Sequence, residues 1–404
     1  MSGRVVIVGA GLVGLCSAFA LVEQGAEVVV VDHGPVGGGA SRGNAGYICP
    51  SQLGPLASPG SLKEAARTIG RPMAPVYLRP AAIPSLAGWL TRFVRSSTAA
   101  KVVRGRAAMV ELDRLSLDAL SALDGAGADL RGPHGIVIVH HERADAERAA
   151  AGYGVSDVLT GAALAAVAPN VAHPDRMHGA LLPRDRSINP SRFVDSLAAL
   201  LVERGVRFLT DRPFEWFDAG GDRVRAVSVG GERVAGDWFV LAAGAGTAAV
   251  ARRLGVRLAL IGGKGYSFTV TPYTTVPHAV LFEDEHVACT PLDGGLRVAG
   301  TMELGGIDGV IDARRVEGIA RSARTVLREV DLAGRRDLWV GPRPVTADGL
   351  PVIGRPNGWE NVVIGTGHGM YGVTLAPATG VVVADLLLRG RAPVDISALT
   401  PDRF

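Results

Sequence analysis

The chain has 404 residues, enough for two or three domains, with 48% hydrophobic and 20% charged residues, a globular composition. A formal charge of +3 at pH 7 is small for this length and gives no reason to expect nucleic-acid binding. The three cysteines are far apart and lack metal-ligand spacing, so we expect neither disulfides nor a metal site. The first apolar run begins near residue 4, leaving no room for a signal peptide, and no uninterrupted apolar run reaches the ~18 residues that span a bilayer. We therefore expect a cytoplasmic protein, with attachment at the inner face of the membrane left open.

The chain opens with a pattern typical of a β-α-β unit. An apolar run at residues 5–8 leads into Gly9-Ala-Gly-Leu-Val-Gly14, a helical pattern follows, and Asp32 ends a second apolar run. In a dinucleotide-binding turn Gly9 permits the tight bend, Gly11 lets the backbone approach a pyrophosphate, and Gly14 lets the helix pack closely on the strand. The helix amides face the phosphates and Asp32 accepts from the adenosine ribose. A dinucleotide site is favoured over a tight turn without a ligand.

The remaining elements follow in chain order. Residues 34–59 read as a loop rich in Gly, Ser and Pro, and the pattern is helical from Ser61 to about Leu123. Further on we expect a strand at 135–140, a helix at 161–167 with Thr160 as N-cap, a helix from Pro190 to Gly205, a strand at 206–210, a hairpin at 223–234 and a strand at 238–243. The last elements are a strand-rich section at 265–300, a helix at about 314–330, a strand at 361–364 and a helix at 375–388. This order implies a parallel nucleotide-binding sheet interrupted twice by insertions.

A second glycine-rich loop, Gly365-Thr-Gly-His-Gly-Met-Tyr-Gly372, also follows a strand and precedes a helix. Only about one helix and a short tail remain after it, too little for a second nucleotide-binding fold. We therefore interpret the loop as a second wall of the first cofactor site. One such site without a separate nicotinamide domain favours FAD over NAD, and a nicotinamide enzyme is the remote alternative.

Several longer motifs occur along the chain. They are Ser41-Arg-Gly-Asn-Ala-Gly46, Gly263-Lys-Gly-Tyr-Ser267, Arg297-Val-Ala-Gly-Thr-Met-Glu303, Gly341-Pro-Arg-Pro-Val-Thr-Ala-Asp-Gly-Leu-Pro-Val-Ile-Gly354, and Gly365-Thr-Gly-His-Gly369 with Ala376-Pro-Ala-Thr-Gly380. In these motifs the chain resembles the D-amino acid oxidase-type FAD-dependent oxidoreductases, most closely bacterial D-amino acid dehydrogenases. The resemblance implies an α/β fold: a Rossmann-like FAD-binding domain of discontinuous segments and an α+β substrate domain on a mixed sheet. The expected division is 1–60, 185–247 and 340–404 for FAD, and 61–184 and 248–339 for substrate.

The resemblance also implies how FAD is held. Some relatives bind flavin covalently through a histidine, but none occurs here between His33 and His134, so we expect FAD to be non-covalent. The expected cofactor-binding residues, with those of the glycine turn, are Gly9, Gly11, Gly14, Asp32, Ser41, Arg42, Asn44, Ala45, Gly46, Gly244, Gly367, His368, Gly369 and Gly372. Arg42 is expected to pair with the pyrophosphate, the alternative being a plain surface turn. Gly244 either approaches the adenosine side or forms a helix-packing turn. His368 is expected to add a hydrogen bond near the flavin pyrimidine ring, unless it is structural.

Substrate binding is expected to depend on Arg343, because the family places an arginine here that grips an α-carboxylate, and guanidinium binds carboxylate bidentately. The alternative is a structural ion pair with a carboxylate such as Asp348. Tyr266 and Tyr371 are expected to donate to the carboxylate or close the pocket, or else are core residues. Together with His368 these are the expected catalytic residues. Glycine-oxidase-like relatives carry a tyrosine near the position of Ala288, and this chain has none nearby, so we expect a second carboxylate donor from elsewhere or a wider pocket.

The implied reaction is oxidative deamination of a D-amino acid, with a hydride passing from Cα to flavin N5. The imino acid formed hydrolyses to a 2-oxo acid, and a quinone or other carrier receives the electrons. One alternative is a secondary amino acid substrate (D-hydroxyproline, D-proline, sarcosine) or glycine, with oxygen as a possible acceptor. Another is a flavin-binding subunit of a larger complex. Residues 76–104 combine Trp89, Leu90, Phe93 and Val94 with basic residues, which fits either a membrane-facing helix or one that covers the active site.

Overall fold

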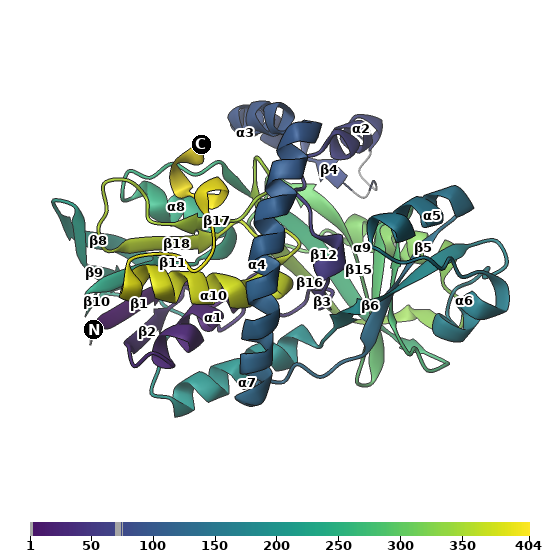
Figure 1. Cartoon of the computed structure of the whole chain (residues 1–404), viewed down its shortest axis with the longest axis horizontal. Helices are drawn as coiled ribbons and strands as arrows, with labels where there is room; N and C mark the ends of the chain where they lie inside the picture. The colour runs from purple at the N-terminus through teal and green to yellow at the C-terminus, as the bar shows by residue number, and fades with distance from the viewer. Residues whose placement is uncertain (1–2, 69–73, 75) are drawn as a thin grey trace.

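The computed structural model describes residues 3–68, 74 and 76–404. Within them, two large sheets lie on either side of the long helix α4 (Ala99–Gly125), which crosses the middle of the view (Figure 1). The six-stranded sheet has the order β17-β18-β11-β1-β2-β7. Its strands are β17 (Val352–Gly354), β18 (Val362–Thr366), β11 (Trp238–Leu241), β1 (Arg4–Val8), β2 (Glu27–Val31) and β7 (Arg207–Leu209). All neighbours are parallel except β17 and β18, and the order outward from β1 is that of a dinucleotide-binding sheet.

Both faces of this sheet are covered, which is why its strands read as continuous apolar runs. Val5 and Ile7 point into a core shared with α1 (Leu12–Val22), α4, α7 (Pro190–Glu203) and α10 (Gly372–Arg389). Val6 and Val8 point the other way, into a core shared with α8 (Thr247–Arg252) and a three-stranded sheet. That small sheet consists of β8 (Phe214–Gly220), β9 (Arg223–Val229) and β10 (Glu232–Ala235). Its second hairpin confirms the prediction for residues 223–234, whereas β8 was not predicted.

Helix α10 is long and apolar enough to cross a membrane by length and composition, and 78% of it is buried inside the protein. It packs on α1, α4 and β18, so it is a core helix of the sheet layer. It begins at Gly372, three residues before the expected start, and contains Pro377 in its second turn. The earlier start matters because it brings the helix N-terminus directly against the glycine loop at residues 365–369.

The nine-stranded sheet has the order β16-β12-β15-β14-β13-β5-β6-β3, with β4 paired to β15. Its strands are β3 (Tyr47–Ile48), β4 (Val76–Leu78), β5 (His134–His140), β6 (His178–Ser187), β12 (Leu260–Pro272), β13 (Ala279–Phe282), β14 (Val287–Leu292), β15 (Gly295–Leu304) and β16 (Val330–Thr346). Parallel pairs (β5–β13, β4–β15) occur among antiparallel ones, which confirms the mixed sheet. Every strand of the six-stranded sheet comes from the segments expected to bind FAD. Two parts of those segments, β3 and the end of β16, pair in the nine-stranded sheet instead.

The helices outside the six-stranded layer are α2 (Pro59–Thr68), α3 (Ile83–Ser96), α5 (Arg143–Gly152), α6 (Gly161–Val167) and α9 (Ala313–Val326). The segment expected to be helical throughout therefore contains β4, whose pairing with β15 no local pattern indicates; its residues 69–73 and 75 lie outside the described part. Helix α7 begins at Pro190 as expected, with the Asn189 side chain accepting from two amides. Thr160 is the N-cap residue of α6 as expected, but its side chain makes no capping hydrogen bond, and its hydroxyl donates to the carbonyls of Pro174 and Met177 instead.

Candidate active site

The first glycine turn has the geometry that its sequence predicts. Gly9 has φ of +122°, and a Cβ there would lie 2.2 Å from the carbonyl oxygen of Ala242. A Cβ on Gly14 would lie 1.9 Å from the Gly9 carbonyl oxygen, so α1 can approach β1 only because this residue is glycine. Gly11 is the N-cap of α1 and carries no capping side chain. The Asp32 carboxylate accepts from the Ala10 amide (2.7 Å) and the Gly34 amide (3.0 Å), which fixes the turn against the end of β2.

A cavity of about 690 Å³ opens at the carboxyl ends of β1, β2, β11 and β18 and extends to β16. Of the residues discussed above, it is lined by Gly9, Gly11, Asp32, Ser41, Asn44, Gly244, Gly246, Arg343, Gly365, His368, Gly369 and Gly372. The first turns of α1 and α10 both contribute to the lining, so the positive ends of two helix dipoles face the same space. Such a space suits a ligand that is anionic at two places.

The loop at residues 41–46 is held in place from both sides. The Asn44 side-chain amide donates to the carbonyls of Ala40 (3.0 Å) and Ser41 (2.9 Å), and its oxygen accepts from the Gly46 amide (2.7 Å). The Ser41 hydroxyl accepts from the Leu12 amide at 3.0 Å and so satisfies one of the exposed amides of α1. Ala45 and Gly46 do not line the cavity: the Ala45 carbonyl accepts from Thr290, and Gly46 adopts φ of +69°. These last two residues shape the loop.

A pyrophosphate contact by the Arg42 side chain is contradicted by the geometry. Its Nε donates to the Val36 carbonyl at 2.8 Å, and its Nη2 pairs with the Asp195 carboxylate of α7 at 2.7 Å. Arg42 is also absent from the cavity lining. The guanidinium is therefore committed to joining the loop to α7. Asp195 lies 153 residues away in the chain, so no local pattern shows this pairing.

Arg343 lies on β16 and is one of the residues that line the cavity. One nitrogen, Nη1, donates to the carbonyl oxygen of Thr301 at 3.0 Å. In the described part of the chain no carboxylate pairs with it, and the alternative partner Asp348 is bound to Arg403 at 2.7 Å. Burial lowers the pKa of Arg343 to about 10, so it remains charged at neutral pH. A guanidinium with five N–H donors and one protein acceptor is ready to bind an anion.

The two tyrosines lie outside the cavity lining. Tyr266 is 1% exposed, and its hydroxyl donates to Glu303 at 2.8 Å, which in turn pairs with Arg79. The Tyr371 hydroxyl donates to the Gln52 carbonyl at 3.0 Å. Burial raises the pKa of both hydroxyls. Each hydroxyl thus already has a protein acceptor, which agrees with the alternative that both are core residues.

His368 is 4% exposed and lines the cavity through its backbone and ring. Its Nε2 lies 2.7 Å from the Thr379 hydroxyl, which itself donates to the Leu375 carbonyl at 2.9 Å. This assigns the ring proton to Nε2 and leaves Nδ1 as an acceptor without a partner in the described chain. Burial lowers the pKa of His368 to about 4, so the ring is neutral at pH 7. His368 is therefore a neutral ring bound to α10, and a hydrogen bond between it and the flavin stays a prediction.

Comparison with known proteins agrees with this geometry. The sequence matches the family described as FAD dependent oxidoreductase over residues 4–386. The chain belongs to this family. It is 32% identical to the D-amino acid dehydrogenase of Granulibacter bethesdensis, covering 99% of each chain. The fold is similar to glycine oxidase from Geobacillus kaustophilus (TM-score 0.75, 21% identity, covering 100% and 99% of the two chains) and to iminodiacetate oxidase from Chelativorans sp. BNC1 (TM-score 0.74, 19% identity, covering 98% and 99%).

The cofactor of this oxidoreductase family is FAD, and the cavity residues fit it. The start of α1, where Ser41 binds the Leu12 amide and Gly11 has no capping side chain, offers its remaining amides to a pyrophosphate. Asp32 is placed for a ribose, and the start of α10 offers positive potential to the flavin. Sequence reasoning missed many residues of the lining, among them Trp339, Ile307 and Met370. The sequence signal for Trp339 is the pair of glycines Gly43 and Gly341. In the structure a Cβ on either would overlap the Trp339 indole, at 2.1 and 2.2 Å, so these two glycines make room for the ring.

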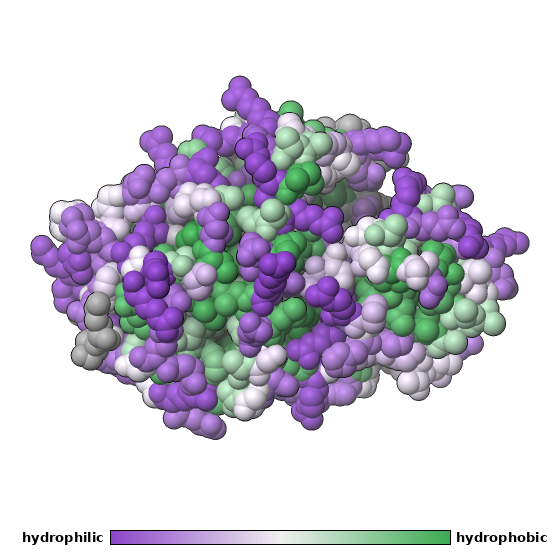
Figure 2. All heavy atoms as spheres, in the orientation of Figure 1, coloured by the Kyte–Doolittle hydropathy of each residue, from purple (hydrophilic) through white to green (hydrophobic). Residues whose placement is uncertain are grey.

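Helix α3 answers part of the question raised by residues 76–104. Trp89 is 7% exposed, stacks on Phe93 with ring centroids 5.1 Å apart, and donates to the Val345 carbonyl at 3.3 Å. Leu90 packs in the same cluster, whereas Val94 is 55% exposed. Most of the apolar face thus packs against β15 and β16, and Figure 2 shows hydrophilic side chains projecting at the end of the molecule where α3 lies. Membrane contact by this segment stays a prediction.

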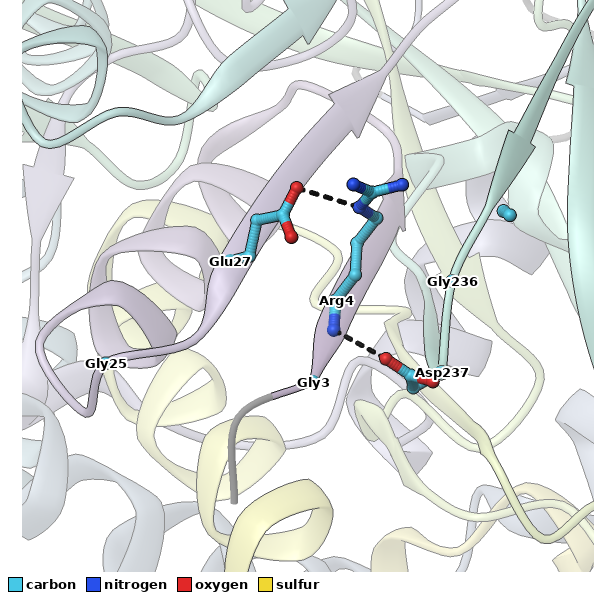
Figure 3. Close-up of a pocket in the computed structure, with 7 residues that line it drawn as sticks. Gly3, Arg4, Gly25, Glu27, Gly236 and Asp237 are labelled. Atoms are coloured by element: carbon cyan, nitrogen blue, oxygen red, sulfur yellow. Dashed lines mark hydrogen bonds and ion pairs between the residues drawn. The ribbon is translucent and has the colours of Figure 1, made fainter.

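A second hollow lies at the amino ends of β1, β2 and β11, at the opposite end of the sheet from the FAD cavity (Figure 3). Arg4 and Glu27 form an ion pair at 2.8 Å there, and Asp237 accepts from the Arg4 amide at 2.7 Å. Arg4 and Glu27 are thus paired with each other, and the Asp237 carboxylate is bound to a backbone amide.

Proposed function

We propose that the chain is a FAD-dependent D-amino acid dehydrogenase in which Arg343 binds the α-carboxylate of the substrate. The observation that carries the proposal is the Arg343 guanidinium, which lines the FAD cavity and has no carboxylate partner in the described chain. The name of the 32% identical relative supports the D-amino acid as substrate, and its description as a dehydrogenase supports a carrier such as a quinone as acceptor. The proposed substrate and electron acceptor of this chain rest on that similarity.

FAD, held by the glycine turn before α1 and by the start of α10, would supply the oxidant for hydride removal from the substrate α-carbon. The chain's own residues hold the substrate: Arg343 fixes the carboxylate, and Trp339, Ile307 and Met370 are available as walls that orient the Cα–H bond. Among the described lining residues Asp32 is the one carboxylate, and it already accepts two backbone amides beside β2. No carboxylate of the described lining is therefore free to act as a general base at the α-carbon. The amine must enter deprotonated, and the imino acid formed hydrolyses to a 2-oxo acid after release.

Anaerobic bleaching of the flavin band tests the proposal. The purified holoenzyme is mixed without oxygen with D-amino acids, their L-enantiomers, and glycine, sarcosine, D-proline and D-hydroxyproline. We expect bleaching by primary D-amino acids, then rapid reoxidation by a quinone analogue and slow reoxidation by air. Bleaching only by glycine or secondary amines would replace the substrate, as the neighbours glycine oxidase and iminodiacetate oxidase allow. A flavin that none of these compounds bleaches would refute the proposal and favour a subunit that needs a partner.

A further inference from the structure

The pairing of β12 with β15 is irregular beside Arg343. In the pairing of β12 with β15, Lys264 faces Glu303 and Tyr266 faces Gly300, so Gly265 stands opposite two residues, Thr301 and Met302. This is a β-bulge in β15, a feature that often lies next to active sites because it re-aims a strand. The pairing of β12 with β16 on its other side stays regular here, with Gly265 opposite Gly341.

Thr301 sits at the bulge in a strained backbone conformation. Its φ is +60°, in the left-handed region that a β-branched residue rarely adopts. Its carbonyl oxygen is the one that accepts from Arg343 Nη1 at 3.0 Å. Strain of this kind persists where the surrounding structure enforces it, and such residues cluster at functional sites. The bulge thus provides the acceptor that orients the Arg343 guanidinium.

Gly265 provides the space for the same group. A Cβ on this residue would lie 2.3 Å from Arg343 Cζ, 2.3 Å from Nη1 and 2.4 Å from Nη2. The guanidinium therefore lies flat against the Gly265 backbone. Because Gly265 does not have a positive φ, alanine can adopt its backbone conformation. Glycine is therefore required at this position by the space that the guanidinium occupies and not by the backbone conformation.

We infer that Gly265 and the Thr301 bulge are a positioning device that sets the Arg343 guanidinium in the orientation that binds the substrate carboxylate. The inference rests on the proposed role of Arg343 and extends it to two residues that do not themselves touch substrate. Gly265 stops the guanidinium from being pushed into the cavity, and the Thr301 carbonyl holds one of its nitrogens. The remaining donors are then directed to the cavity that Arg343 lines.

Gly265→Ala tests this device because its clash is confined to the end of a flexible side chain. The variant is expected to fold and to retain FAD, with the guanidinium displaced by the new methyl group. The probe is benzoate, a carboxylate that has no amine to oxidise, titrated into the holoenzyme while the flavin spectrum is followed. We expect at least a tenfold rise in the benzoate Kd, and a rise in the substrate KM larger than any fall in kcat.

Arg343→Ala and the double variant complete the cycle. If Gly265 acts through Arg343, Gly265→Ala weakens benzoate binding in the parent but changes it less than twofold in the Arg343→Ala background. A benzoate Kd within twofold of the parent in Gly265→Ala, alongside a tenfold rise in Arg343→Ala, overturns the positioning role and leaves the proposed function standing. An equal loss in both backgrounds also overturns it, because the effect would not pass through Arg343. An unchanged Kd in Arg343→Ala overturns both.

Discussion

Replacement of Arg343 by alanine is the most direct test of the substrate site. In the described chain this guanidinium has one acceptor, the Thr301 carbonyl, and Arg343 lines the cavity. A hydrogen bond to a charged group contributes about 1.5–3 kcal/mol. At about 1.4 kcal/mol per tenfold change in equilibrium, losing one such bond to the carboxylate raises the dissociation constant about 10- to 100-fold. The pKa of about 10 means that the charge is present throughout the neutral range.

The assay is steady-state reduction of a quinone analogue at a series of substrate concentrations, with flavin content measured in parallel. Arg343→Ala is expected to raise KM by that factor while the flavin content stays unchanged. Arg343→Lys keeps the charge but not the planar pair of donors, so its KM is expected to lie between that of the parent and that of Arg343→Ala. A KM in Arg343→Ala within twofold of the parent, with turnover retained, would refute the carboxylate role.

Three further predictions concern stability and cofactor binding. Gly14→Ala places a Cβ 1.9 Å from a backbone oxygen, so a cost of about 1–3 kcal/mol is expected, seen as a lower Tm and a lower ratio of flavin to protein absorbance after gel filtration. Gly88→Ala lies inside α3 with no atom within 4 Å of its Cβ, and it is expected to stabilise by about 0.5–1 kcal/mol, raising Tm at unchanged turnover. Burial raises the pKa of Asp113 from 3.8 to about 6, so the folded state binds its proton more tightly and stability falls as pH rises between these values. Asp113→Asn removes this penalty, on the order of 3 kcal/mol, and its Tm advantage is expected at pH 7 and absent near pH 4; an advantage independent of pH would contradict this account.

The parts of the fold that the sequence predicts are those set by neighbours in the chain. The turn from Gly9 to Gly14 follows from the spacing of its glycines, and the start of α7 follows from Asn189 and Pro190. The pairing of β4 with β15 does not follow, because it joins Val76 to Met302 across more than half of the chain. The same limit explains Arg42, which its motif suggests for a phosphate and which a carboxylate on α7 has already bound.

Tyr266 was expected in the substrate pocket but lies in the core, and the alternation of side chains along its strand already indicates this. Side chains along a strand alternate between its two faces, so Tyr266 and Gly265 point to opposite sides of β12. If the arginine that binds substrate lies over Gly265, the adjacent tyrosine must lie on the other face, where its hydroxyl meets Glu303. A glycine inside a strand marks close approach by another group. Gly265 and Gly341 on neighbouring strands therefore mark the face that carries Arg343 and Trp339, and reading the motif by face rather than by residue type would have assigned the site to these two side chains.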